Sequence, residues 1–142
     1  MDRQLLRSQL ERHEELRLKP YLDTAVPPRL TIGYGRNLDD AGISREESDY
    51  MLANDIDKVE RELDTIDEYV ALDRIRQTVI ANMSFNLGFN GLLQFKRMWA
   101  AIGRCDYEKA AKEMLDSKWK TQVGYRALEL AEIMRTGEGV GG

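Results

Sequence analysis

The stretch from Arg12 to Asn37, RHEELRLKPYLDTAVPPRLTIGYGRN, decides the fold of this chain. Two carboxylates stand nine positions apart in it, Glu14 and Asp23, and a Thr-Ile-Gly-Tyr-Gly bend follows from Thr31 to Gly35. Leucines at helical spacing precede Glu14, so we expect a helix that ends at this residue. Pro20 prevents the helix from continuing. The rest of the stretch predicts a short strand before Asp23 and a second strand that enters the glycine-rich bend.

Three parts of this stretch resemble, in the same order, the motif of the phage-type lysozymes, the endolysins of T-even and lambdoid bacteriophages. They are Glu14-Glu-Leu-Arg-Leu-Lys19, Tyr21-Leu-Asp-Thr24 and Thr31-Ile-Gly-Tyr-Gly35. The resemblance implies that Glu14 is a general acid and Asp23 the second catalytic carboxylate. It also implies that Thr31 helps to hold the attacking water.

Glycoside hydrolysis needs one protonated and one ionised carboxyl group on opposite sides of the sugar bond. If water attacks directly, with inversion, the two carboxyl groups should lie roughly 6.5–9.5 Å apart. Two departures from the family pattern stand nearby. The connector Ala25-Val-Pro-Pro28 is longer than the family's usual turn, and Arg36 occupies a position that is commonly His. The longer connector raises the question of how Thr31 lies relative to Asp23.

A second group of residues resembles the family's saccharide cleft. The segment Asn82-Met-Ser-Phe-Asn-Leu-Gly88 matches the family's Asn-x-x-Phe-x-x-Gly, in which the Phe lines the cleft and the next residue reaches the sugar. The resemblance therefore implies substrate contacts at Phe85 and Asn86. Trp119 and Arg126 resemble a Trp and an Arg near the family's active site, where the Arg faces the acid. Each of these residues could instead belong to the core or to an ordinary helix surface.

The order of elements predicts an α+β fold, in which one helix and a small hairpin or three-stranded sheet precede a helical remainder. We expect one lysozyme domain over residues 1–142. Within it we predict a small β-containing lobe over 14–50, a connecting helix over 44–64, a helical lobe formed by 1–13 and 65–137, and a flexible tail over 138–142.

Local signals place the later helices. Ser44 and Glu47 form a capping box that opens the connecting helix. Asp73 to Gly88 predicts a strongly buried helix with glycine at its end. Further helices are expected over the ranges 92–102, from 106 and 125–136. A segment over 117–122 contains Trp119, and we expect a loop at 36–42, a connector at 67–71 and a turn at 90–91.

Composition excludes several classes of protein. The net charge is −4, so no overall basic character points to nucleic acid, and no apolar run reaches membrane-spanning length. The only cysteine, Cys105, allows no internal disulfide, and with His13 it cannot build a metal site. No glycine-rich phosphate loop is present. We therefore expect no metal, no cofactor, no nucleic-acid partner and no stable membrane insertion.

The resemblance implies a muramidase that cleaves the β-1,4 bond between N-acetylmuramic acid and N-acetylglucosamine in bacterial peptidoglycan. The N-terminal residues lack the apolar core of a secretory signal. We thus expect a monomer that stays in the host cytoplasm until a separately encoded holin releases it to the wall. Two alternatives stay open: a lytic transglycosylase on the same substrate, and a non-catalytic wall-binding or phage-structural module of the same fold.

Overall fold

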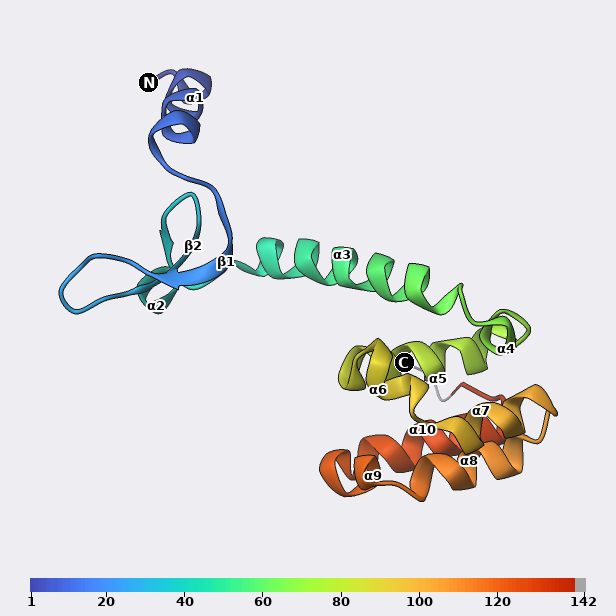
Figure 1. The fold of residues 1–142 in the computed structure, drawn as a ribbon. Coiled ribbons are helices and arrows are strands. Elements are labelled where there is room, and N and C mark those ends of the chain that lie inside the picture. Colours follow the sequence, from blue (N-terminus) through green and yellow to red (C-terminus); the bar gives the residue numbers. More distant parts are fainter. Residues whose placement is uncertain (140–142) are drawn as a thin grey trace. The chain divides into compact units, whose positions relative to one another are not determined.

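The computed structural model describes residues 1–139 and divides the chain into two compact units, Met1–Met51 and Leu52–Gly142. The division falls within the long helix α3 (Arg45–Leu63), which is drawn in green in Figure 1. Each unit is described by itself below. The residues at 140–142, part of the tail predicted from sequence, lie outside the described range.

The first unit contains the helix and the sheet predicted from the opening stretch. Helix α1 (Arg3–His13) begins at Asp2, whose carboxylate accepts a hydrogen bond from the Leu5 amide at 2.9 Å. An antiparallel sheet of order β1-β2-β3 follows. The strands are β1 (Arg17–Leu22), β2 (Leu30–Gly33) and β3 (Arg36–Asn37), and the short helix α2 (Leu38–Ala41) comes directly after them. The predicted α+β class, with its sheet near the N-terminus, is confirmed.

Helix α3 begins at the predicted capping box. The Glu47 amide donates to the Ser44 hydroxyl at 3.1 Å, and the Ser44 amide donates to the Glu47 carboxylate at 2.8 Å. The same carboxylate accepts from the Arg36 guanidinium, which ties strand β3 to the first turn of α3. Arg36, the residue that departs from the family's His, thus has a structural partner within the first unit.

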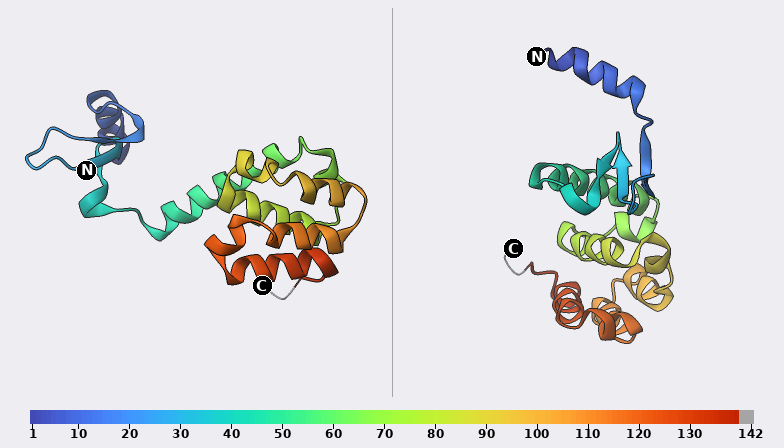
Figure 2. Two further views of the ribbon diagram at one scale, coloured as in Figure 1. Left: turned by 60° about the horizontal axis from the view of Figure 1, so that its bottom comes forward. Right: turned by 90° about the vertical axis from the view of Figure 1, so that its left-hand side faces the viewer.

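The second unit contains the hydrophobic core. Helix α5 begins after its N-cap Asp73 and ends before Gly88, as predicted. Its Val79, Ile80 and Met83 side chains are fully or almost fully buried. Helices α8 and α10 pack side by side, and α7 packs on α8 (Figure 2). The helices are α4 (Asp67–Val70), α5 (Arg74–Leu87), α6 (Phe89–Leu93), α7 (Lys96–Gly103), α8 (Tyr107–Leu115), α9 (Lys118–Val123) and α10 (Tyr125–Thr136).

Four local predictions were wrong. The expected helix over 92–102 is two helices, because Phe95 leaves the helical conformation (ψ 56°) and its ring meets Trp119 edge-on, with centroids 6.3 Å apart. The turn expected at Asn90-Gly91 lies inside α6. The expected loop at 36–42 contains strand β3 and helix α2. The expected connector at 67–71 contains helix α4. Elements this short carry too few residues for hydrophobic periodicity to reveal them.

Candidate active site

Glu14 stands where the sequence predicted it, at the C-terminal end of α1. Its backbone is extended (φ −103°, ψ 131°), and its amide closes the helix on the Leu10 carbonyl at 2.8 Å. Its carboxylate lies against the glycine bend after β2. A side-chain carbon at Gly35 would stand 3.5 Å from Oε2 of Glu14. Gly35 has a φ of +81°, which favours glycine, so the bend presents bare backbone to the acid.

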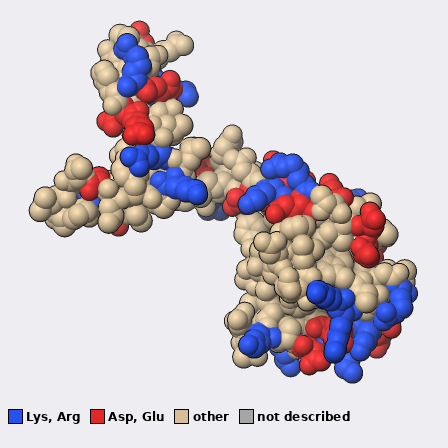
Figure 3. All heavy atoms as spheres, in the orientation of Figure 1, with Lys and Arg blue, Asp and Glu red and all other residues tan. Residues whose placement is uncertain are grey.

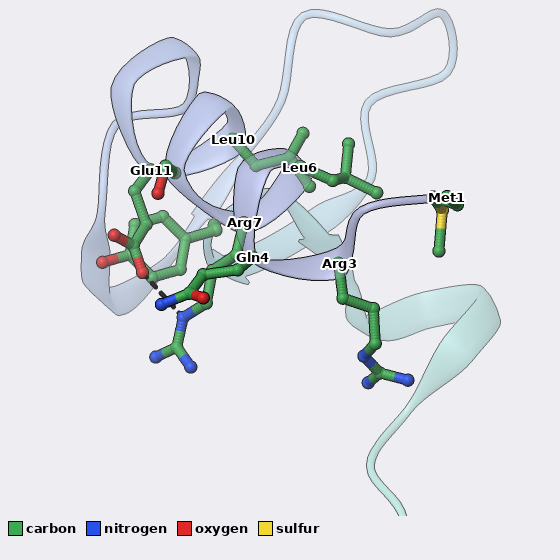
Figure 4. Close-up of a pocket in the computed structure, with 9 residues that line it drawn as sticks. Met1, Arg3, Gln4, Leu6, Arg7, Leu10 and Glu11 are labelled. Atoms are coloured by element: carbon green, nitrogen blue, oxygen red, sulfur yellow. Dashed lines mark hydrogen bonds and ion pairs between the residues drawn. The ribbon is translucent and has the colours of Figure 1, made fainter.

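Helix α1 also borders a groove of about 1060 Å³, which it shares with Tyr34 of the same glycine bend (Figure 4). Leu6 and Leu10 line this groove, and an Arg7–Glu11 ion pair lies beside them. Within the first unit α1 buries none of its residues. Its contribution to the candidate site is therefore to end at Glu14, next to the bend.

Asp23 lies directly after β1, at the entrance to the hairpin tip. Its Oδ1 accepts hydrogen bonds from the amides of Arg29 at 2.9 Å and Ala25 at 3.0 Å. The Arg29 bond lowers the pKa of Asp23 most and the Ala25 bond adds to it, while partial burial opposes both. Two amide donors favour the carboxylate over the acid. Asp23 is thus ionised at neutral pH, as a base or a stabiliser of positive charge must be.

Thr31 is the one buried residue of the first unit, at 3% exposure, and it occupies the central strand β2. It pairs with Tyr21 of β1 on one side and Asn37 of β3 on the other. Its hydroxyl donates to the Arg29 carbonyl at 2.9 Å. Because this bond uses the hydroxyl's single proton, the oxygen can only accept further hydrogen bonds.

The backbone of Arg29 joins Asp23 to Thr31. Its amide donates to the Asp23 carboxylate, and its carbonyl accepts both the Asp23 amide at 3.0 Å and the Thr31 hydroxyl. The longer connector noted in the sequence loops out between these contacts. The two predicted residues are therefore brought together despite the extra length.

Asp39 and Asp40 of helix α2 contact Leu30 and Arg29. The Leu30 amide donates to Asp39 at 2.7 Å, and the Arg29 guanidinium lies 3.3 Å from the Asp40 carboxylate. The sequence prediction did not include these two residues. The signal that could have found them is the Asn37-Leu-Asp-Asp run, because Asn at an N-cap followed by acidic residues is typical of a helix start.

The second unit brings together Phe85 and Arg126. Both line a groove of about 520 Å³ along α3 and α5. Two nitrogens of the Arg126 guanidinium donate to the side-chain oxygen of Asn82, at 2.9 Å and 2.5 Å, and one of them also reaches the Asn82 carbonyl at 3.2 Å. These contacts fix the plane of the guanidinium. Asn82, which sequence reasoning used only as a motif position, is the residue that orients Arg126.

Trp119 and Asn86 form a second pair in this unit. The indole N–H of Trp119 donates to the Asn86 side-chain oxygen at 2.9 Å. Trp119 is 2% exposed, so its surroundings are the core and Asn86 rather than solvent. Asn86 is exposed, and with its oxygen engaged its amide NH2 remains as a donor.

Among residues 1–139, no group of three or more His, Cys, Asp or Glu could hold a metal ion. None of the helices in the same range is long and apolar enough to cross a membrane.

Comparison with known proteins finds a matching family and several similar proteins. The family model described as phage lysozyme matches residues 11–135. The pre-baseplate central spike protein Gp5 of Enterobacteria phage T4 is 30% identical over 155 residues, which cover 90% of this chain and 27% of that protein. That span exceeds the 142 residues of the whole chain, so the spike protein carries insertions relative to it.

Two proteins of Dictyostelium discoideum are also similar. Probable T4-type lysozyme 1 is 38% identical over 69 residues, 49% of this chain and 41% of that protein. Probable T4-type lysozyme 2 is 29% identical over 99 residues, 67% of this chain and 58% of that protein. The chain therefore spans between about a quarter and three fifths of the length of these relatives.

Proposed function

Because the chain belongs to the phage lysozyme family, we propose that it is a glycoside hydrolase that cleaves the β-1,4 bond between N-acetylmuramic acid and N-acetylglucosamine in peptidoglycan. The observation that carries the proposal is the junction at Arg29. There an ionised Asp23 and a buried Thr31 hydroxyl share one backbone unit. Glu14 belongs to the same unit of the fold and lies against the neighbouring glycine bend.

In this mechanism Glu14 donates its proton to the oxygen that leaves with one sugar. A water molecule attacks the carbon from which that oxygen departs, and Asp23 takes one of its protons. Thr31 accepts a hydrogen bond from the other O–H, because its own proton is held by the Arg29 carbonyl. The water oxygen's lone pair is then free to form the new bond. The negative charge of Asp23 also offsets the positive charge that develops on the sugar.

The second unit would supply sugar contacts through Phe85, Asn86 and Arg126. An aromatic ring next to an oriented guanidinium suits a sugar, which has apolar faces and polar edges. Asn86 would donate from its NH2 to a sugar oxygen. Trp119 would act through Asn86, since its N–H fixes the Asn86 side chain and its ring is buried.

The relationship to the spike protein favours one alternative, a phage-structural module that keeps the fold and binds the wall. It rests on the extent of that similarity, 90% of this chain. A lytic transglycosylase is the other alternative, in which a hydroxyl of the sugar itself replaces water.

Mass analysis of the soluble fragments from purified peptidoglycan separates the three. Hydrolysis gives fragments with reducing ends, a transglycosylase gives anhydro ends, and a structural module releases no fragments. We expect reducing ends, with their release dependent on added full-length protein. Anhydro ends or the absence of soluble fragments would overturn the proposal.

We also propose that the protein acts as a monomer and reaches the wall through a separate holin. Light scattering of the purified chain tests the first statement, and a dimer would contradict it. Expression with and without a holin in the same host tests the second. We expect lysis only in the presence of the holin, and lysis without it would contradict this route.

A further inference from the structure

Charge is distributed very unevenly along the second unit. Residues 52–73 contain eight Asp or Glu and two Lys or Arg. Residues 96–120, which form α7 to α9, contain seven Lys or Arg and four Asp or Glu. The chain as a whole has a net charge of −4, so this segment has the opposite sign to the rest. In Figure 3 basic side chains gather over the area where α8 and α9 lie in Figure 1.

A tertiary contact brings together two of the helices that carry these cations. The edge-on contact of Phe95 with Trp119 brings the start of α7 next to α9. Lys96 follows the first ring, and Lys118 and Lys120 flank the second, with all three exposed. We define the α7–α9 cation surface by five exposed residues: Lys96, Arg97, Lys112, Lys118 and Lys120.

Glu113 joins the remaining members to this surface. It pairs with Lys109 at 2.9 Å, and that bond does most to lower its pKa, with Arg97 and Lys112 lowering it further through their charges. Arg97 and Lys112 are therefore close enough to feel the same carboxylate. A groove of about 470 Å³ lies between α7 and the end of α8, with Lys96 and Arg97 on one wall and Glu113 and Asp116 on the other.

Three of the four acidic residues of this segment are already engaged, and the fourth is the exposed Asp116. Glu113 pairs with Lys109, Glu108 lies 3.6 Å from Arg135, and Asp106 caps α8 by accepting from the Lys109 amide. None of the five residues of the α7–α9 cation surface forms an ion pair within the described part of the chain. Gathered like charges repel one another, and that repulsion is relieved when an anionic partner binds.

We propose that the α7–α9 cation surface binds the free carboxylates of the peptide stems of peptidoglycan. The choice of partner rests on the proposed function, because the stems are attached to the sugar chain that the enzyme would cleave. A polymer with carboxylates at regular intervals meets several dispersed cations at once. Such contacts hold an enzyme near a solid substrate, and their strength falls as salt rises.

The test measures binding of the full-length Glu14→Gln protein to sacculi freed of phosphate polymers, at several salt concentrations. The patch variant adds Arg97→Gln, Lys112→Gln and Lys118→Gln. The matched control instead adds Arg45→Gln, Lys58→Gln and Arg61→Gln, three exposed cations of α3 that give the same net charge. We expect the patch variant to bind about tenfold more weakly and with a shallower salt dependence, and the control to change by less than about twofold.

Sacculi with methyl-esterified stems identify the anion. On them the Glu14→Gln protein and the patch variant should bind equally weakly. Equal binding of the patch variant and the control to intact sacculi would overturn the inference. So would a difference that persists on esterified sacculi, or one seen only on walls that keep phosphate polymers, on nucleic acid or on anionic vesicles.

Failure of the inference is distinguishable from failure of the proposed function. A wild-type protein that binds sacculi through this surface but releases no reducing ends would overturn the function alone. A protein that releases reducing ends but whose binding ignores these charges would overturn the inference alone.

Discussion

The two units of this chain are held together by different kinds of interaction. Among residues 1–139, every buried apolar side chain lies in the second unit, between Leu63 and Met134, whereas the one buried residue of the first unit is the polar Thr31. Carboxylates organise the first unit by accepting backbone amides, at Asp2, Asp23, Asp39 and Glu47. Carboxylates thus hold together the first unit, which also contains the candidate catalytic carboxylates. The second unit is held together by the packing of apolar side chains.

Truncation in the second unit should give the largest change. Met83 is fully buried on α5, so Met83→Ala removes apolar contacts and leaves a cavity. We expect a loss of about 2–5 kcal/mol in the free energy of unfolding, measured by urea denaturation followed by circular dichroism. The matched control Met51→Ala, at a half-exposed methionine, should cost less than about 0.5 kcal/mol. Equal losses would contradict the assignment of the core to the second unit.

Removal of the Thr31 hydroxyl should affect activity more than stability. Thr31→Val keeps the β-branched shape in strand β2 but can accept no hydrogen bond from water. We expect the rate of fragment release to fall about tenfold or more, with the thermal midpoint nearly unchanged. Thr31→Ser, which keeps the hydroxyl, should retain most of the rate. Full activity in Thr31→Val would remove this residue from the water-holding role.

Helix caps should have different consequences in the two units. Asp2 and Asp106 cap α1 and α8 in the same way, each accepting from the amide three residues later. Loss of either cap costs about 1 kcal/mol. Because α8 packs into the core, Asp106→Ala should lower the denaturation midpoint of the whole second unit. Asp2→Ala should only fray α1, seen as a loss of helical NMR shifts there. A drop of the second unit's midpoint in Asp2→Ala would contradict this contrast.

The smallest expected change is a pH dependence, because the groups concerned are exposed and water screens their charges. The Arg36 guanidinium, followed by the Ser44 amide, lowers the pKa of Glu47 to about 2 from an ordinary 4.5. A lowered folded-state pKa means that the contribution is complete above pH 4.5 and is lost as pH falls towards 2. The pKa of Asp23 is lowered as well.

Amide exchange measured between pH 5 and pH 2 checks this dependence. After correction for intrinsic rates, protection at the Arg29 and Ser44 amides should fall, while protection at Ile80 should fall less. The second unit also contains acids with lowered pKa, Asp73 and Glu113 among them, but its apolar core does not titrate. Glu47→Gln should flatten the dependence at Ser44. An equal loss of protection in both units would contradict the comparison.

Sequence alone predicted the elements that have strong local signals. The bounds of α3 and α5 follow from the Ser44 capping box and from Asp73 with Gly88. The break at Phe95 could not be predicted, because it depends on a contact with Trp119 that lies 24 positions further along the chain. Helices of four residues are decided by caps and burial rather than periodicity.

In the candidate site, too, the sequence predicted some features and not others. The motif located Asp23 and Thr31, but not the Arg29 backbone that joins them, since a backbone contact leaves no residue-type signature. Burial of Trp119 could not be distinguished from a place on a sugar-binding surface, because an indole suits both. The motif gave the position of Asn82 but not its hydrogen bonds to Arg126, which lies 44 positions further along the chain.

The most direct test of the account compares Glu14→Gln with Glu15→Gln in the release of reducing ends from peptidoglycan. Both changes replace one carboxylate by its amide in adjacent residues, and far-UV circular dichroism establishes that both proteins keep their helices. The account predicts that Glu14→Gln abolishes release and that Glu15→Gln retains it. Full activity in Glu14→Gln, or an equal loss in both variants, would contradict the assignment of Glu14 as the acid.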